Sequence, residues 1–209
     1  MSNLLAALVL LSSFAFALEL APKLLDMVQK QFGSDARQRL EKWQELSEIS
    51  RNAPEDRQLR LVNGFFNSIP FISDIGHWGQ EDYWATPVEF LATNGGDCED
   101  FSIAKYLTLR SLGVPDDKLR IVYVKALELN QAHMILAYYP TPDADPLILD
   151  NLVDDIKPAS ERDDLQPVYS FNGEGLWLTK LRGKSRRIGE AKKLDRWVDL
   201  NKRLIDSLR

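Results

Sequence analysis

The sequence predicts an α+β fold in which N-terminal helices pack on an antiparallel β-sheet. Apolar side chains recur at helical spacing through much of residues 21–112, and short runs rich in valine, isoleucine and tyrosine follow. Helices followed by a series of strands are typical of this fold class. The chain has 209 residues, 44% of them hydrophobic, which suffices for one domain with a substantial core. We expect residues 18–209 to form that domain.

Three helices are expected in the first third of the chain. The first covers about 21–32, the second about 34–50, and the third starts within Asn52-Ala53-Pro54-Glu55-Asp56 and carries apolar positions as far as Phe66. Ser34-Asp35 suits the N-cap of the second. The apolar positions of the second and third helices are Leu40, Trp43, Leu46, Ile49, Leu59, Leu61, Val62, Phe65 and Phe66. Residues 69–87 contain several aromatic side chains but little periodicity, so we expect an ordered loop with room for a short strand.

The second half of the chain begins with a helix from Cys98 to about Leu112, for which Gly113 and Pro115 provide a stop signal. An amphipathic helix over 190–208 closes the chain. Four strands are predicted between these helices, at 119–127, 132–139, 146–152 and 175–180.

Residues 1–17 have the character of a signal peptide. The run from Leu4 to Phe16 is almost wholly apolar, and Ala15-Phe16-Ala17 fits a small-x-small cleavage site. This run is shorter than the ~20 apolar residues that usually span a bilayer. No lysine or arginine precedes it, so a buried N-terminal helix and an uncleaved membrane anchor are the alternatives.

The charge pattern argues against nucleic acid as a partner. The formal net charge is -5, and acidic and basic residues are mixed along the chain without a sustained basic stripe. We interpret the local basic clusters at 182–187 and 192–193 as a solvated loop and a solvated helix face.

Cys98 is the only cysteine, and it follows the Gly95-Gly96 turn. In an oxidising compartment structural cysteines usually occur in pairs, so an exported single cysteine is inert and buried, reactive, or bonded to another chain. The flanking sequence Asp-Cys-Glu-Asp is poorly suited to a hydrophobic core and favours a reactive thiol. A cysteine at a helix N-terminus also lies beside backbone N–H groups that stabilise a thiolate and an oxyanion.

His133 and Asp150 follow Cys98 on two predicted strands. Taken alone, His133 fits a core residue on an apolar strand face, and Asp150 fits a turn residue at a strand end. Together with Cys98 they form the set of thiol, base and orienting carboxylate that a cysteine nucleophile requires. We expect Asp150 to bond Nδ1 of the imidazole while Nε2 faces the thiol.

The acidic neighbours Asp97, Glu99 and Asp100 should raise the pKa of the Cys98 thiol. Clustered carboxylates on a turn are ligands suited to Ca²⁺, which would offset their charge. The alternative is helix capping, with Asp97 as the N-cap and the other two acids in the first turn.

Four segments give the chain a resemblance to the bacterial transglutaminase-like cysteine proteinases. They are Trp84-Ala85-Thr86-Pro87-x-Glu89-Phe90-Leu91, Gly96-Asp97-Cys98-Glu99-Asp100, Ala132-His133-Met134 and Leu149-Asp150-Asn151, and the resemblance extends from about Trp43 to Trp177. It implies a papain-like, transglutaminase-like core with Cys98, His133 and Asp150 as the catalytic triad. It also implies Ca²⁺ bound by Asp97 and Glu99, with Asp100 as a third ligand.

The resemblance further implies a periplasmic endopeptidase that is not an integral membrane protein once processed. Similar proteases cut a large surface adhesin near its N-terminus at a double-alanine site and so promote biofilm dispersal. The periplasmic domain of an inner-membrane receptor for cyclic di-GMP holds them inactive. Two alternatives are an acyl transferase of the transglutaminase type and a non-catalytic binding module.

Overall fold

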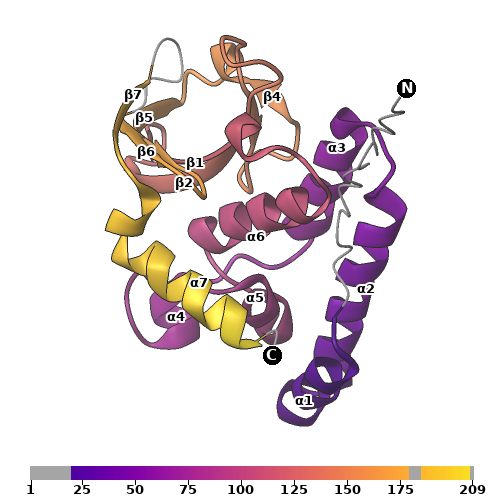
Figure 1. Ribbon diagram of the computed structural model, residues 1–209. Coiled ribbons are helices and arrows are strands. Elements are labelled where there is room, and N and C mark those ends of the chain that lie inside the picture. The colour runs from indigo at the N-terminus through magenta and orange to yellow at the C-terminus, as the bar shows by residue number, and fades with distance from the viewer. Residues whose placement is uncertain (1–19, 179–184, 208–209) are drawn as a thin grey trace, which may run out of the picture.

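The computed structural model describes residues 20–178 and 185–207 (Figure 1). The predicted signal peptide, the end of the fourth predicted strand and the first half of the basic cluster at 182–187 lie outside the described residues. None of the helices within the described ranges has the length and hydropathy that crossing a bilayer requires.

The three predicted N-terminal helices are present as α1 (Pro22–Phe32), α2 (Ser34–Ser50) and α3 (Glu55–Asn67). They form the indigo and violet side of the molecule in Figure 1. Most of their predicted apolar positions are at least partly buried, with Ile49 the exception at 64% exposed. Trp43 of α2 also donates from Nε1 to the Thr108 hydroxyl on α6 (Cys98–Ser111), at 2.9 Å. Helix periodicity therefore predicted these elements and the faces that they bury.

The prediction of a loop over 69–87 is wrong in part, because this region contains α4 (Asp74–Trp78) and leads into α5 (Pro87–Thr93). Helix α4 has five residues, too few to show a helical period. Helix α5 begins with a capping box, in which the Thr86 hydroxyl accepts from the Glu89 N–H and the Glu89 carboxylate accepts from the Thr86 N–H. The short strand is a single β-bridge between Phe71 and Gly96.

The strands form one antiparallel sheet in the order β4-β3-β2-β1-β5-β6-β7. They are β1 (Leu119–Ala126), β2 (Gln131–Tyr138), β3 (Leu147–Leu149), β4 (Lys157–Pro158), β5 (Leu165–Phe171), β6 (Leu176–Leu178) and β7 (Arg186–Gly189).

Three of these strands, β4, β5 and β7, were not predicted. Pro167 in β5 lowers the strand signal, and it pairs where the register with β1 shifts. Strand β7 includes Arg186 and Arg187, which the sequence analysis assigned to a loop. The last helix, α7 (Asp195–Ser207), begins later than predicted, after a 3-10 turn at Ala191–Lys193.

Helix α6 lies between the sheet and the other helices (Figure 1). It packs against β2 on one side and against α3 and α5 on others, so Phe101, Ile103, Ala104 and Leu109 are all buried. The sheet buries a smaller apolar cluster, which includes Val122, Ile135 and Ile148. Strand β2 is thus covered on both faces, and the site residue at its beginning, His133, is 3% exposed.

Candidate active site

Cys98 is the first residue of α6, and the turn before it is held by close packing. Asp100 accepts from the Asp97 N–H through Oδ2 (3.2 Å) and from the Ala85 N–H through Oδ1 (2.7 Å). A Cβ on Gly96 would lie 2.3 Å from Asp100 Oδ2, so only glycine allows this carboxylate to fold back on the turn. The turn therefore fixes the direction in which the Cys98 side chain leaves the helix.

Cys98 and His133 line the same cleft, whose volume is about 400 Å³. Apolar and aromatic side chains form most of its wall, and Arg196 and Asp82 form an ion pair of 2.6 Å at its margin. The other residues that line it are Phe71, Trp84, Asp97, Glu99, Tyr123, Gln131, Ala132, Met134, Leu152 and Tyr169. Tyr123 and Tyr169 stack with their ring centroids 5.1 Å apart. An open cleft with this lining suits a peptide segment.

His133 and Asp150 form a buried hydrogen-bonded pair. Nε2 of His133 donates to Asp150 Oδ1 at 2.7 Å, and the two side chains are 3% and 0% exposed. The nitrogen assignment in the sequence analysis is therefore wrong, since we expected Nδ1 to make this bond. Leu149 of β3 pairs with Leu136 of β2, and continuing this register places Asp150 opposite Ile135, two residues along β2 from His133. From this diagonal position Asp150 meets Nε2 of the imidazole. Nδ1 is the nitrogen that is left for the thiol.

Asp150 is held in its ionised form. Burial alone would raise its pKa, but hydrogen bonds from His133, from the Leu152 N–H and from Arg162 lower the pKa to about 2. An ionised carboxylate can fix the imidazole tautomer and stabilise an imidazolium.

The Cys98 thiol is in the opposite situation. Burial and the nearby Glu99 and Asp97 carboxylates raise its pKa well above the usual value. The thiol donates a hydrogen bond from Sγ to Glu99 Oε2 at 3.0 Å. In this arrangement the neutral thiol is the stable form, as the sequence analysis expected from the acidic neighbours.

The acidic cluster is larger than the sequence predicted, because Asp74 joins it. One oxygen each of Asp74, Asp97 and Asp100 lies within 4.8 Å of the others, and Asp97, Cys98 and Glu99 form a second such group. Burial is the main cause that raises the pKa of Asp74 to about 6 and that of Asp97 to about 8. Asp74 belongs to the short helix that sequence periodicity missed, and no signal in the sequence connects it to Cys98.

The acidic cluster fits a divalent cation. Oδ1 of Asp74 and Oδ1 of Asp97 are buried, and neither has a hydrogen-bond partner among the described residues. A buried carboxylate oxygen without a partner is costly unless a cation or a proton satisfies it. Several carboxylate oxygens around one point are the donor set that Ca²⁺ prefers. Capping and cation binding are compatible here, since Asp100 already caps the helix through its hydrogen bond to Asp97 N–H.

Two further charged residues near Asp150 were not predicted, namely Arg162 and Lys105. Arg162 donates to Asp150 Oδ2 at 2.8 Å, and its side chain is 4% exposed. Lys105 lies two turns after Cys98 on α6 and is 1% exposed. Its burial lowers its pKa to about 7, against the opposing effect of Asp150 and Asp154. In the sequence, nothing distinguishes Arg162 or Lys105 from charged residues on the protein surface.

A cysteine at a helix N-terminus, a buried imidazole–carboxylate pair and an α+β core are together typical of the transglutaminase-like cysteine proteinases. Residues 30–166 match the family described as Bacterial transglutaminase-like cysteine proteinase BTLCP, and the chain belongs to this family. The family predicted from the four sequence segments is thus confirmed, and with it the prediction of a cysteine protease.

Solved structures of Legionella pneumophila LapG are similar over nearly their whole length. The EGTA-treated form is 47% identical with a TM-score of 0.77, and the match covers 90% of this chain and 99% of LapG. The calcium-bound form is 48% identical with a TM-score of 0.73, and the match covers 86% of this chain and 98% of LapG. No curated protein sequence matches the chain.

Proposed function

We propose that this protein is a calcium-dependent cysteine endopeptidase in which Cys98 is the nucleophile, His133 the general base and Asp150 the residue that orients His133. The buried hydrogen bond of 2.7 Å between His133 and Asp150, in the wall of the cleft that Cys98 also lines, carries this proposal. A solvent-exposed pair would not hold one tautomer as firmly, because water competes for both partners.

The reaction begins when His133 Nδ1 takes the proton from Cys98 Sγ and the sulfur attacks the carbonyl carbon of the peptide bond. The backbone N–H of Cys98, at the free N-terminus of α6, donates to the oxyanion that forms. The imidazolium then gives its proton to the leaving amine, which leaves a thioester on Cys98. His133 next takes a proton from water, and the resulting attack releases the carboxylic acid and restores the thiol.

Asp97, Glu99 and Asp100, together with Asp74, are the residues that would hold Ca²⁺. The bound cation would offset the carboxylate charge that keeps the Cys98 pKa high. Two observations support the choice of metal: the unpartnered buried oxygens of Asp74 and Asp97, and the calcium-bound form of Legionella pneumophila LapG.

We further propose that the substrate is a large cell-surface adhesin, cut near its N-terminus at a double-alanine site to promote biofilm dispersal. The mature chain would comprise residues 18–209 as a single domain in the periplasm, released from its signal peptide. The periplasmic domain of a cyclic di-GMP receptor would hold it inactive. These statements rest on the similarity to LapG and on the apolar N-terminal run of the sequence.

The test is to incubate purified residues 18–209 with N-terminal fragments of candidate adhesins. Mass spectrometry should find two fragments in the presence of calcium, none with a chelator, and none for the Cys98→Ala variant. Cleavage by that variant would contradict the role of Cys98. A labelled primary amine in the same mixture distinguishes the alternative of acyl transfer, since a transferase would attach the amine to the substrate. Biological activity that survives Cys98→Ala would instead indicate a binding module.

A further inference from the structure

Both carboxylate oxygens of Asp150 accept hydrogen bonds from neighbouring groups. Oδ1 accepts from His133 Nε2 at 2.7 Å and from the Leu152 N–H at 3.0 Å. Oδ2 accepts from Arg162 Nη2 at 2.8 Å. Rotation about the terminal torsion of an aspartate is soft, so a carboxylate keeps one orientation only when both oxygens have fixed partners. Arg162 is the side chain that occupies the second oxygen.

Arg162 is itself held on its other side. Its Nε donates to Asp164 Oδ1 and its Nη2 to Asp164 Oδ2, each at 2.8 Å. This two-pronged contact keeps the guanidinium plane in one position. The series His133, Asp150, Arg162 and Asp164 thus leads from the cleft to a side chain that is 30% exposed.

The backbone places Arg162 beside the strand that leads to Asp150. Strand β4 pairs with β3, and the 3-10 turn at Ala159–Glu161 follows β4 directly. The Ala159 N–H donates to the Pro146 carbonyl at 2.8 Å, just before β3 begins. Because β3 ends one residue before Asp150, this arrangement sets the distance between Arg162 and the carboxylate.

We propose that Arg162 is a positioning residue of the active site, which keeps the Asp150 carboxylate turned toward His133, and that Asp164 in turn holds Arg162. This inference rests on the proposed roles of His133 and Asp150. Arg162 touches neither the substrate nor the thiol in this scheme, and it acts only through Asp150.

A purely structural ion pair is the alternative, and the rate per folded molecule distinguishes the two. Asp150 faces His133 from β2, Lys105 from α6 and Arg162 from the segment after β4, while Asp154 lies near Lys105. Removal of the Arg162 charge leaves the His133–Asp150 pair with less positive charge around it. The pair should then bind its shared proton more tightly. The shift tests the contact of Arg162 with the pair, whereas a structural pair alone would lower stability and leave kcat per folded molecule unchanged.

Nuclear magnetic resonance can follow this effect because the chain has only two histidines, His77 and His133. In Arg162→Met we expect the titration of His133 to move up by about one pH unit, as for the loss of a nearby charge. His77 should titrate as before, since its Nε2 is hydrogen-bonded to the Thr93 hydroxyl at 2.7 Å and Arg162 takes no part in that bond. Arg162→Lys keeps the charge and should leave both titrations in place.

Kinetics on the adhesin fragment provide the second measurement. Arg162→Met should lower kcat by about tenfold to a hundredfold, the range of outer supporting residues, with KM within about twofold. Arg162→Lys should recover part of kcat. Arg120→Met is the matched control, because Arg120 packs on Trp177 and Tyr139 and touches no residue of the triad. It should change neither kcat nor the His133 titration.

An unmoved His133 titration in Arg162→Met, or a loss of kcat that only follows the fraction of unfolded protein, would overturn the inference. If Arg162→Met does not fold, Asp164→Asn takes its place: it leaves the arginine charge but removes its anchor, and should lower kcat severalfold without moving His133. An unchanged kcat in that variant, with no recovery in Arg162→Lys, would also overturn it. A wild-type protein that cleaves no fragment would count against the proposed function, while the titration would still test whether Arg162 acts on the His133–Asp150 pair.

Discussion

At the scale of single residues, the ionisation of Cys98 depends on which of two opposing electrostatic effects is larger. A helix N-terminus favours a negative charge by about 0.3–1 kcal/mol. One carboxylate about 4 Å away disfavours it by about 4 kcal/mol at an effective dielectric constant of 20. Asp97 and Glu99 both raise the thiol pKa, so the helix N-terminus alone cannot produce a thiolate. His133 can take the thiol proton, but the negative charge of Asp97 and Glu99 still has to be offset. The reactivity of Cys98 therefore depends on the acidic cluster around it.

Asp74 provides a test of the cation site that leaves the catalytic triad intact. Asp74→Asn removes one negative charge from the cluster, so we expect calcium affinity, measured by isothermal titration calorimetry, to fall by about tenfold or more. The activity of the variant should recover at high calcium concentration, because Cys98 and His133 are unchanged. Asp117→Asn is the control, since Asp117 is exposed on the 3-10 turn before β1. An affinity equal to wild type in Asp74→Asn would exclude Asp74 as a ligand.

The sequence predicted the site residues that are distinctive within their local sequence. Cys98 stands out as the only cysteine in an acidic turn, and His133 and Asp150 stand out by their order on strands. Nothing in the local sequence distinguishes Asp74 or Arg162, because their partners are distant in the chain and only folding brings them together. The choice of Nε2 for the bond to Asp150 depends on the register of β2 and β3, which side-chain periodicity does not define.

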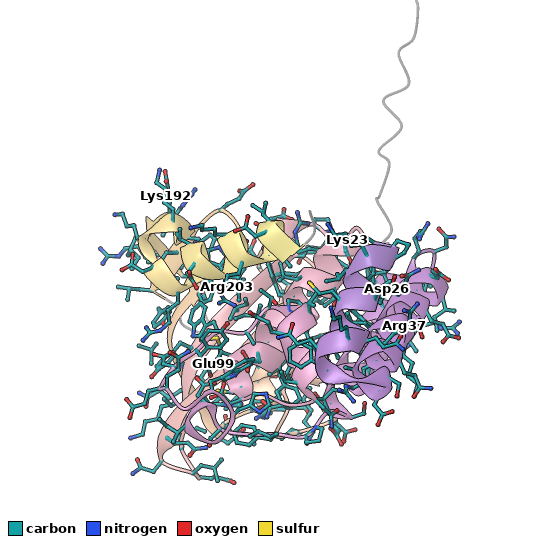
Figure 2. The ribbon with its side chains drawn as sticks, turned by 90° about the horizontal axis from the view of Figure 1, so that it is seen from below. Lys23, Asp26, Arg37, Glu99, Lys192 and Arg203 are labelled. Atoms are coloured by element: carbon teal, nitrogen blue, oxygen red, sulfur yellow. The ribbon has the colours of Figure 1, made fainter. Side chains whose placement is uncertain are left out.

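At the scale of elements, α7 holds the segment that forms one wall of the cleft. Arg203 donates from Nη1 to the Tyr83 hydroxyl (3.0 Å) and to Glu89 Oε2 (2.5 Å), and from Nη2 to the Trp84 carbonyl (2.5 Å). Figure 2 shows Arg203 on the side of α7 that faces the rest of the protein, well away from the surface pair of Asp26 and Arg37. A helix near the C-terminus of the chain thus supports residues next to the cleft.

Arg203→Ala should therefore affect both stability and the order of this wall. Hydrogen bonds to charged groups contribute about 1.5–3 kcal/mol each in favourable cases, and several are lost here, so we expect the free energy of unfolding to fall by about 2–4 kcal/mol. Hydrogen exchange of the Tyr83 and Ala85 amides should speed up before global unfolding.

The control for this prediction is Arg60→Ala. Arg60 forms only an exposed pair with Asp56 at 2.7 Å, and such pairs contribute little. Its unfolding free energy should stay within about 0.5 kcal/mol of wild type. Equal losses in the two variants, or unchanged exchange at Tyr83 and Ala85 in Arg203→Ala, would show that α7 does not support the wall.

Local chemistry also explains which elements were predictable. The Thr86-Pro87-x-Glu89 sequence is a readable capping signal for α5, although the sequence analysis used it only as part of the resemblance. Pro167 weakens the sequence signal for strand β5, and β4 has only two residues, too few to show an alternating pattern. These elements are stabilised by pairing within the sheet rather than by their own composition, so sequence periodicity has little to detect.

At the scale of the whole molecule, α6 connects the cleft to the centre of the core. Its first residue is Cys98, and its middle carries Lys105 into the space between helices and sheet, where the ammonium lies 5.9 Å from the Phe101 ring. Asp150 and Arg162 are buried charges that have each other as close partners of opposite sign. Lys105 is held mainly by the more distant charges of Asp150 and Asp154, and burial lowers its pKa to about 7.

The stability of the protein should therefore depend on Lys105 in a pH-dependent way. A lysine whose pKa is about 7 when folded and about 10.4 when unfolded binds fewer protons in the folded state between these values. Stability from this group thus rises as the pH increases from 7 toward 10.4, and the full cost of burying the charge is present below pH 7.

Replacement of this charge should make the protein more stable near neutral pH. We expect Lys105→Met to raise the free energy of unfolding by about 1–4 kcal/mol at pH 6, the range for buried charges replaced by apolar groups. The gain should shrink steadily by pH 9.5, because the wild-type lysine is then neutral in the fold. Urea unfolding at both pH values measures the difference, with the exposed Lys125→Met as the control. A gain that is the same at both pH values would mean that Lys105 stays charged in the folded protein up to pH 9.5, so that burial does not lower its pKa. A loss at pH 6 would mean that its charge stabilises the acidic groups around it.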